Sequence, residues 1–192
     1  LFYHMFDNLA VRDYETAKVK PHLATSWKAT NDTTWEMELR TDVKFHDGSA
    51  FTAETVKANV ERVLNPENKS PQRGNWEAVD RVEVAGPNKV VWYTKKPYPV
   101  FAERLQNLQF VPEKVLKEKG PAFLAENAIG TGPYKFVKWD RGQQIVMERN
   151  EEYWGPKPAF KTAMVRIIPD ATTAVAELLA GRVDIVPAFP IA

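Results

Sequence analysis

Residues 130–155 read GTGPYKFVKWDRGQQIVMERNEEYWG, and this stretch predicts a tight turn that leads into a β-hairpin. Gly130 and Gly132 can adopt backbone angles that other residues resist, so they suit a sharp turn. Apolar and polar residues then alternate over residues 134–139 and 145–149, which is the period of a strand with one buried face. A phosphate cradle is the alternative for the glycine-rich turn, but the lysine and the full spacing of a P-loop are missing. A constrained turn is therefore the favoured interpretation.

Further blocks of sequence stand ahead of this hairpin. They are Pro21-His22-Leu23-Ala24-Thr25-Ser26-Trp27, residues 35–40 (WEMELR), residues 43–48 (VKFHDG) and residues 51–53 (FTA). Together with the hairpin, these blocks resemble the family 5 extracellular solute-binding proteins of ABC importers, which are the peptide and nickel binders. The blocks stand in the order of the family and extend from Phe6 to Pro187. Their number makes the resemblance more specific than a lone Gly-x-Gly-Pro motif.

The resemblance implies an α/β fold, namely a partial first lobe of the type II periplasmic-binding-protein-like class. Its mixed sheet is expected to carry an inserted, mostly antiparallel α+β subdomain. Residues 1–34 and 126–192 are expected to form the α/β part of the lobe, and residues 35–125 the insertion. Members of the family are much longer than this chain, so the resemblance also implies a fragment from which the second lobe is absent.

The composition is that of an ordinary globular protein, with 44% hydrophobic and 27% charged residues among 192. Lysine plus arginine number 26 against 25 for aspartate plus glutamate, so no basic surface for nucleic acid or for an anionic membrane is indicated. The lack of cysteine excludes disulfides, thiolate metal sites and a cysteine nucleophile within this sequence.

Local patterns predict the elements that precede the signature hairpin. The clearest is a helix that begins after Thr52 as N-cap, has Val56 and Val60 on its buried stripe, and ends at Asn65-Pro66. The polar segment from there to Gly74 is expected to be a loop. The other expected elements are a strand over 9–12, a hairpin over 26–40 that turns at 31–33, a hairpin over 82–93 that turns at 86–88, and two short helices between 99 and 120, the second closed by Gly120.

After the signature hairpin, the chain predicts a strand over residues 164–168, a helix over 172–180 and a second strand over 183–186. A strand, a helix and a strand in this order are typical of a right-handed parallel crossover. We expect this unit to supply the α/β part near the carboxyl end.

The resemblance also implies ligand-binding residues. Asn8, Leu9 and Ala10 match the place where family members present strand backbone to the cleft, which would let a ligand pair with the main chain. An ordinary buried strand is the alternative for this segment.

Three further residues are candidates on the same basis. Trp76 follows a polar loop outside any clear periodicity, and an aromatic residue at the matching place lines the ligand cleft in nickel-binding relatives. Packing in the core is the alternative for Trp76. Asn107 and Gln109 lie near the matching position of another cleft-lining segment.

No catalytic residue, no metal ligand and no cofactor is predicted. His4, His22 and His46 lack the spacing of a metal site and are interpreted as structural or solvent-facing. His46-Asp47 could suggest a catalytic dyad, but neighbours on an extended segment point to opposite faces, and the chain has no Gly-x-Ser-x-Gly motif. A hydrolase built on a binding-protein lobe is therefore disfavoured.

The resemblance implies the substrate-binding component of an ABC importer, which captures a peptide or another small solute between two hinged lobes and delivers it to a membrane permease. The alternatives are a nickel or metal-complex binder of the same family and a sensor or interaction domain built on such a lobe. The expected partners are the ligand and the ABC permease, with no nucleic acid, and the truncated lobe is expected to self-associate. The expected location is periplasmic or otherwise extracytoplasmic, with membrane anchoring of the full-length protein left open.

Overall fold

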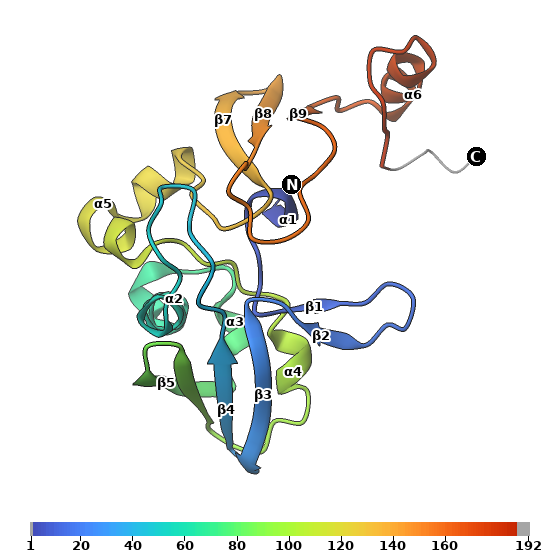
Figure 1. The fold of residues 1–192 in the computed structure, drawn as a ribbon. Helices are drawn as coiled ribbons and strands as arrows, with labels where there is room; N and C mark the ends of the chain where they lie inside the picture. Colours follow the sequence, from blue (N-terminus) through green and yellow to red (C-terminus); the bar gives the residue numbers. More distant parts are fainter. Residues whose placement is uncertain (1, 188–192) are drawn as a thin grey trace.

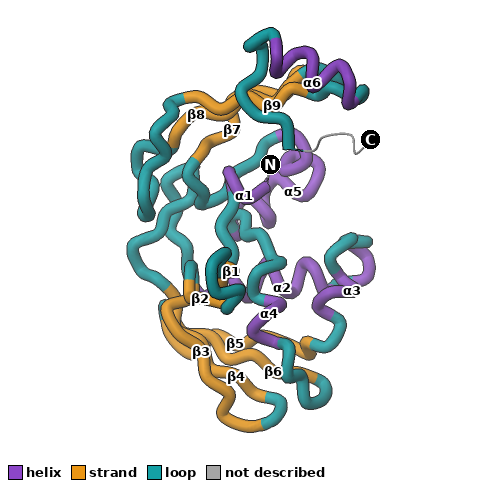
Figure 2. The backbone as a smooth tube through the Cα atoms, turned by 90° about the vertical axis from the view of Figure 1, so that its right-hand side faces the viewer, coloured by secondary structure: helices purple, strands orange, loops and turns teal. Residues whose placement is uncertain are grey.

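The computed structural model describes residues 2–187 and shows an elongated molecule with a sheet at each end (Figure 1, Figure 2). All strand pairs among these residues are antiparallel. The elements up to residue 94 are α1 (Phe2–Met5), β1 (Ala10–Arg12), β2 (Val19–Pro21), β3 (Ala24–Asn31), β4 (Thr34–Leu39), α2 (Ala53–Leu64), η1 (Pro66–Asn68), α3 (Arg73–Trp76), β5 (Val79–Gly86) and β6 (Lys89–Thr94). The later elements are α4 (Phe101–Arg104), α5 (Glu113–Glu126), β7 (Tyr134–Asp140), β8 (Gln144–Arg149), β9 (Thr162–Arg166) and α6 (Ala171–Leu179).

The larger sheet has the strand order β3-β4-β6-β5. Period-two alternation explains its buried face, because Met37 and Leu39 of β4 point to the same side and are both buried. Trp35 of β4 lies directly opposite Trp92 of β6, so the two indoles share that side. The two hairpins predicted to turn at residues 31–33 and 86–88 are confirmed.

Helix α2 begins and ends where the sequence predicts. The Oγ1 of Thr52 accepts a hydrogen bond from the backbone N–H of Thr55 at 3.3 Å, which satisfies a donor that the first turn leaves free. Asn65 is the C-cap, and Pro66 follows it at the start of η1. Local chemistry therefore fixes both ends of this helix.

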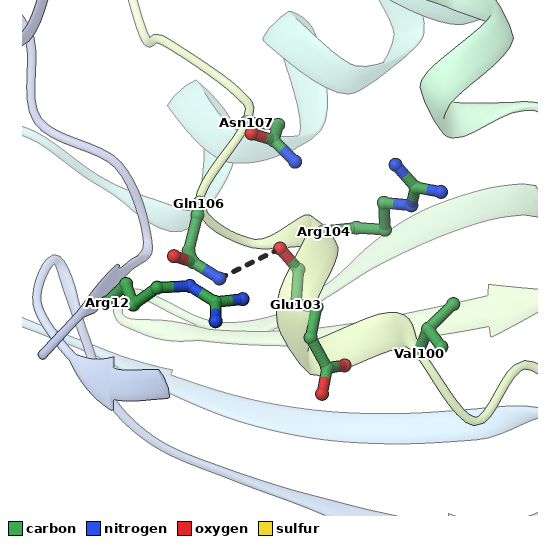
Figure 3. Close-up of a pocket in the computed structure, with 6 residues that line it drawn as sticks. All are labelled: Arg12, Val100, Glu103, Arg104, Gln106 and Asn107. Atoms are coloured by element: carbon green, nitrogen blue, oxygen red, sulfur yellow. Dashed lines mark hydrogen bonds between the residues drawn. The ribbon is translucent and has the colours of Figure 1, made fainter. Parts of the chain in front are cut away.

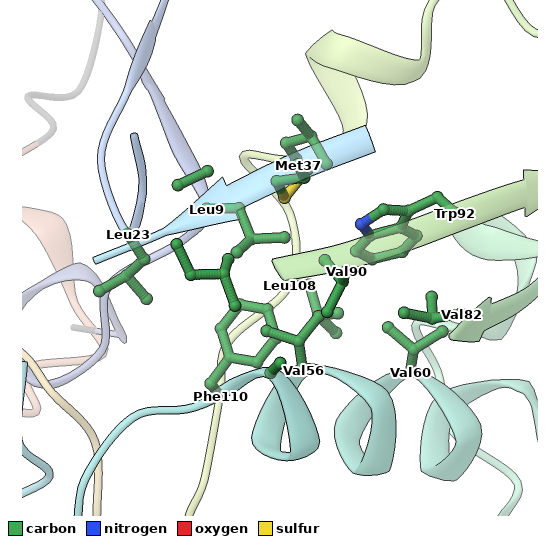
Figure 4. Packing of buried hydrophobic residues seen from close by; sticks show 14 of the residues in the cluster. Leu9, Leu23, Met37, Val56, Val60, Val82, Val90, Trp92, Leu108 and Phe110 are labelled. Atoms are coloured by element: carbon green, nitrogen blue, oxygen red, sulfur yellow. The ribbon is translucent and has the colours of Figure 1, made fainter. Parts of the chain in front are cut away.

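The main hydrophobic cluster, which we name the sheet–helix core, lies between the larger sheet and α2. Figure 4 shows Val56 and Val60 of α2 facing Val90 and Trp92 of β6. Fully burying an aliphatic or aromatic side chain contributes about 1.5–3 kcal/mol relative to leaving it exposed. The largest side chains that are under 2% exposed belong mostly to this core, and they include Trp76, Trp92, Phe101 and Phe110.

A smaller cluster, which we name the hairpin core, lies where β7 and β8 meet α1 at the other end of the molecule (Figure 1). Its buried members are Met5, Phe6, Val111, Tyr134 and Met147. The predicted signature hairpin is confirmed, since β7 pairs with β8 and the chain turns at Gly142 with a φ of 74°.

The turn ahead of this hairpin was expected to need glycines for their backbone angles, but it needs them because neighbouring backbone lies too close for a Cβ. Neither Gly130 nor Gly132 is among the described residues with positive φ. A Cβ at Gly130 would lie 2.0 Å from the backbone oxygen of Met5, and one at Gly132 would lie 2.5 Å from the backbone carbon of Met5. The turn is therefore glycine-rich because α1 packs against its backbone.

The predicted parallel crossover is not formed by the described residues. Strand β9 and helix α6 match its first strand and its helix, but residues 183–187 form no strand. Strand β9 pairs only with β8, and Ile185 is 81% exposed. A strand needs a hydrogen-bonded neighbour, and Figure 1 shows α6 leading the chain away from the sheet. The prediction of a second strand over 183–186 is thus wrong for this structure.

Two shorter predictions are also corrected. The segment expected to be a loop up to Gly74 contains η1 and begins α3, so it is partly helical. The second helix of the 99–120 region does break at Gly120, whose φ is 70°, but α5 resumes after it and extends to Glu126. Proline can begin a helix, and Pro121 follows this break directly. The first of the two predicted helices is α4, and Phe101 in it and Leu105 at its C-cap are both buried.

Trp139 ends the alternation over residues 134–139, and it is 41% exposed. Its ring is covered only in part by the guanidinium of Arg141, which lies 4.7 Å from the ring centroid. The proposed boundary between residues 34 and 35 falls beside the turn between β3 and β4, which pair in one sheet. The division of the chain into an α/β part and an insertion stays a prediction.

Candidate ligand-binding site

Two of the predicted cleft-lining segments lie against each other. The backbone N–H of Ala10 donates a hydrogen bond to the carbonyl oxygen of Leu105 at 3.3 Å. This bond joins β1 to the turn that follows α4, which also contains Asn107. Segments that are nearly a hundred positions apart in the sequence are therefore adjacent in the fold.

An open pocket of about 470 Å³ lies beside this junction (Figure 3). Its size is within the range of pockets that bind small molecules, which is about 300–1,000 Å³. Helix α4 positions one wall, because Phe101 and Leu105 are fully buried in the sheet–helix core and turn the other side of the helix outward. The lining residues are Arg12, Val100, Glu103, Arg104, Gln106 and Asn107.

The charged side chains that line this pocket form no ion pairs among the described residues. Among residues 2–187, no ion pair joins Arg12, Arg104 or Glu103 to another side chain. Arg12 donates from Nη1 to the carbonyl oxygen of Ala17 at 3.1 Å, and Arg104 donates from Nε to the hydroxyl of Tyr98 at 2.9 Å. Each guanidinium therefore keeps further donors that a ligand can use.

The structure places the predicted residues in different surroundings. Asn107 is half-buried and lines the pocket, whereas Gln109 is half-buried outside it. The side chains of Leu9 and Ala10 are fully buried in the sheet–helix core, and Asn8 is buried with no hydrogen-bond partner for its Oδ1. The carbonyl oxygen of Leu9 already accepts the backbone N–H groups of His22 and Ala24.

Trp76 is 1% exposed and stacks on Trp92 with the ring centroids 5.6 Å apart. This position fits the alternative of core packing, and a ligand contact for Trp76 stays a prediction, as it does for the other candidates. Sequence reasoning missed Arg12, Glu103 and Arg104 because charged residues at a strand end and on a short helix carry no pattern that separates them from solvent-facing ones.

Residues from separate blocks of the quoted sequence meet at the buried carboxylate of Asp7, two positions before the predicted strand over 9–12. Asp7 is 5% exposed, and donors from three other segments surround its oxygens. The distances to Asp7 oxygens are 2.9 Å from His22 Nε2, 3.0 Å from Thr131 Oγ1, 3.2 Å from the Tyr153 hydroxyl and 3.0 Å from Trp154 Nε1. Burial, and after it the charge of Asp7, raises the pKa of the Tyr153 phenol, so this hydroxyl stays protonated and donates.

His46 holds the glycine-rich turn and is not part of a catalytic dyad. The backbone N–H of Gly130 donates to Nδ1 at 3.2 Å, so the ring proton sits on Nε2, which donates to the carbonyl oxygen of Gly132 at 3.0 Å. Burial lowers the pKa of His46, which agrees with a neutral ring. Asp47 is engaged elsewhere, because its Oδ1 accepts hydrogen bonds from the backbone and hydroxyl of Ser49.

Residues 2–187 contain neither a metal-ligand cluster nor a helix that could span a membrane. No group of three or more His, Asp or Glu side chains there is arranged to hold a metal ion. None of the helices in that range has both the length and the apolar character needed to cross a membrane.

Comparisons with known proteins identify the family of this chain. The sequence model for bacterial extracellular solute-binding proteins, family 5, matches residues 18–192. The probable D,D-dipeptide-binding periplasmic protein DdpA of Escherichia coli (strain K12) is 34% identical over 190 residues, covering 93% of this chain and 36% of that protein. The nickel-binding periplasmic protein of the same strain is 33% identical, covering 87% of this chain and 33% of that protein.

Solved structures show the same fold. NikZ from Campylobacter jejuni in complex with Ni(L-His) has a TM-score of 0.88 and 34% identity, and the match covers 94% of this chain and 37% of NikZ. AppA from Bacillus subtilis in complex with a nonapeptide has a TM-score of 0.87 and 31% identity, with the same coverage. The described fold is thus the mixed α/β fold of a partial binding-protein lobe, and it spans about a third of the length of these relatives. The chain belongs to the family 5 bacterial extracellular solute-binding proteins.

Proposed function

We propose that this chain supplies one wall of the ligand cleft in the substrate-binding component of an ABC importer. The observation that carries the proposal is the Ala10–Leu105 hydrogen bond, which joins two segments with predicted cleft positions beside one open pocket in a member of this family. The relatives are named as periplasmic binding proteins for peptides and for nickel, which supports an extracytoplasmic location and a role in holding a solute.

In the whole protein, a second lobe closes over the ligand by hinge motion, and a membrane permease receives the solute. The ligand binds the closed form more tightly than the open form, so it shifts the population toward closure. The contribution of this chain is a preformed wall, because α4 is fixed by Phe101 and Leu105 and β1 is fixed by its pairing with β2. No bond in the solute is made or broken.

A metal-complex binder of the same family is the second candidate. The chain is about as similar to NikZ in complex with Ni(L-His), at 34% identity, as to AppA in complex with a nonapeptide, at 31% identity. In this case we expect the organic part of the metal complex to contact this wall, as a bound Ni(L-His) could.

Isothermal titration calorimetry on the full-length protein and on residues 1–192 tests the proposal. Dipeptides with a free carboxyl end and a nickel–histidine complex serve as the probes. We expect the full-length protein to bind one class of probe, and the isolated lobe to bind it far more weakly, because burial of a small ligand needs both walls. Failure of the full-length protein to bind either class would contradict the proposed function, and equally tight binding by the isolated lobe would contradict the closing of two lobes.

A further inference from the structure

The charges and amide groups that line the pocket beside β1 indicate which class of solute it can bind. This inference rests on the proposed function. Its lining residues carry two guanidinium groups and one carboxylate, so the formal charge of the lining is positive. The two amide side chains of Gln106 and Asn107 add neutral hydrogen-bonding groups, and Val100 is the single aliphatic member. A polar solute with a negatively charged group fits this lining better than an apolar one.

Among the described residues, no carboxylate of the β1–β2 segment forms an ion pair with Arg12. The next residue in the sequence, Asp13, forms no ion pair with Arg12. The Asp13 side chain instead accepts hydrogen bonds from the backbone N–H groups of Glu15 and Thr16 and forms an ion pair with Lys20. The hydrogen bond from Lys20, followed by those from Thr16, holds the pKa of Asp13 well below its usual range, so Asp13 stays charged and committed to its own turn.

The Arg12 side chain is also held in place before any ligand arrives. Its Nη1 donates to the carbonyl oxygen of Ala17 across the β1–β2 loop. Figure 3 shows the guanidinium lying near Gln106, on the side of α4 opposite to the Arg104 side chain. Gln106 is fixed in turn, because its Nε2 donates to the backbone oxygen of Glu103 at 3.1 Å. The remaining nitrogens of Arg12 therefore form an ordered donor group in the lining of the pocket.

From these contacts we propose that Arg12 binds a carboxylate of the solute and so determines specificity for ligands that carry one. The planar guanidinium presents paired N–H groups that match the two oxygens of a carboxylate. Arg104 is less available, because its Nε is engaged with Tyr98 and its side chain lies on the other side of the helix. Glu103 limits the positive charge of the lining, so the pocket suits a single carboxylate.

The test uses the full-length protein, calorimetry, and two probes that differ only at the carboxyl end, alanyl-alanine and alanyl-alanine amide. We expect the wild type to prefer the free acid, and Arg12→Gln to weaken binding of the free acid about tenfold or more while leaving the amide unchanged. Arg12→Lys should recover part of the loss, because it keeps the charge without the paired donors. Arg141→Gln is the matched control, since Arg141 is also exposed but lies on the hairpin, outside the lining of this pocket, and pairs with Glu126 of α5.

The outcomes separate the two proposals. Equal affinity of Arg12→Gln and wild type for the free acid overturns the role of Arg12 while the proposed function stands. Equal losses for the acid and the amide overturn it as well, because they indicate a general effect on the wall. If neither dipeptide probe nor a nickel–histidine complex binds the wild type, the proposed function fails and the role of Arg12 fails with it. Circular dichroism of the variants confirms that each is folded.

Discussion

The sheet–helix core and the unit formed by the hairpin, β9 and α6 differ in how completely they bury their apolar side chains. Trp92, Phe101 and Leu105 of the first region are fully buried. In the second region Met147 is fully buried, but Met164 is 54% exposed and Leu179 is 83% exposed. Burial of apolar surface is the main favourable contribution to folding, so the first region should dominate the stability of this chain.

The largest expected effect comes from removing a central side chain of the sheet–helix core. Trp92→Ala leaves a cavity beside Trp76 and Phe101, whose rings lie 5.6 and 5.4 Å from that of Trp92. We expect a loss of about 4 kcal/mol in the free energy of unfolding, measured by urea denaturation with far-UV circular dichroism. Leu179→Ala is the control in the other region, and its exposed side chain should cost less than about 0.5 kcal/mol. Similar losses for the two variants would contradict the contrast between the regions.

The next largest loss of stability is expected from a substitution at Asp7, whose carboxylate joins segments of both regions. Two donors approach each oxygen of Asp7, namely His22 and Tyr153 at Oδ1 and Thr131 and Trp154 at Oδ2. An asparagine has one oxygen, so Asp7→Asn deprives two donors of their acceptor in either orientation of the amide.

We expect Asp7→Asn to lower the free energy of unfolding by about 3 kcal/mol, because a buried charged hydrogen-bond network is broken. The same denaturation experiment measures it. Asp80→Asn is the control, since the Asp80 carboxylate is half exposed and pairs only with Arg81, and it should change stability by less than about 0.5 kcal/mol. A loss for Asp7→Asn no larger than that of the control would show that the junction does not depend on this carboxylate.

A third and smaller effect tests the close packing of α1 on the glycine-rich turn. A methyl group at Gly132 would lie 2.5 Å from the backbone carbon of Met5, and backbone cannot move aside as a side chain can. Gly132→Ala should therefore cost about 2 kcal/mol through displacement of α1.

Gly74→Ala is the matched control for this substitution. A Cβ at Gly74 would have no heavy atom within 4 Å, and its backbone does not have a positive φ. We expect its stability to stay within about 0.5 kcal/mol of the wild type. If Gly132→Ala were tolerated as well as Gly74→Ala, the glycines of the turn would not be needed for the approach of α1.

The sequence predicts the elements whose causes are local. The Thr52 cap, the stop at Asn65-Pro66 and the alternation around Met37 each depend on residues a few positions apart, and the structure confirms them. Within the described residues, the predicted second strand of the crossover is wrong because a strand depends on a neighbouring edge, which sequence periodicity does not reveal.

The candidate site is less predictable for the same reason. The donors around Asp7 come from residues up to 147 positions away, and the partner that crowds Gly132 lies in α1. Resemblance to a family indicated the segments around Ala10 and Asn107, but not the pocket residue Arg12 beside them. Among the described residues Arg12 forms no ion pair, and the hydrogen bonds that hold Asp13 in its own turn are visible only in the folded chain. Which side chains are free to bind a ligand therefore depends on contacts that form only in the folded chain.

The smallest expected effect is local and lies in α6. Glu177 joins this helix to its surroundings through ion pairs with Arg166 of β9 and with Arg182. Hydrogen bonds from Arg182 and then from Arg166 lower the pKa of the Glu177 carboxyl from 4.5 to about 2. A carboxyl whose pKa is lower in the folded state stabilises that state above its unfolded pKa, and the contribution disappears as the pH falls through the folded pKa.

Protection of the α6 amides against hydrogen exchange should therefore fall between pH 4.5 and pH 2, while the amides of β6 in the sheet–helix core stay protected over more of that range. Glu177→Gln should weaken α6 protection already at neutral pH and remove its dependence on acid. The two arginines of these pairs are exposed, so no change in the global unfolding midpoint is expected. If acid or Glu177→Gln exposed β6 and α6 together, the two regions would unfold as one unit, and the difference in burial would not translate into a difference in local stability.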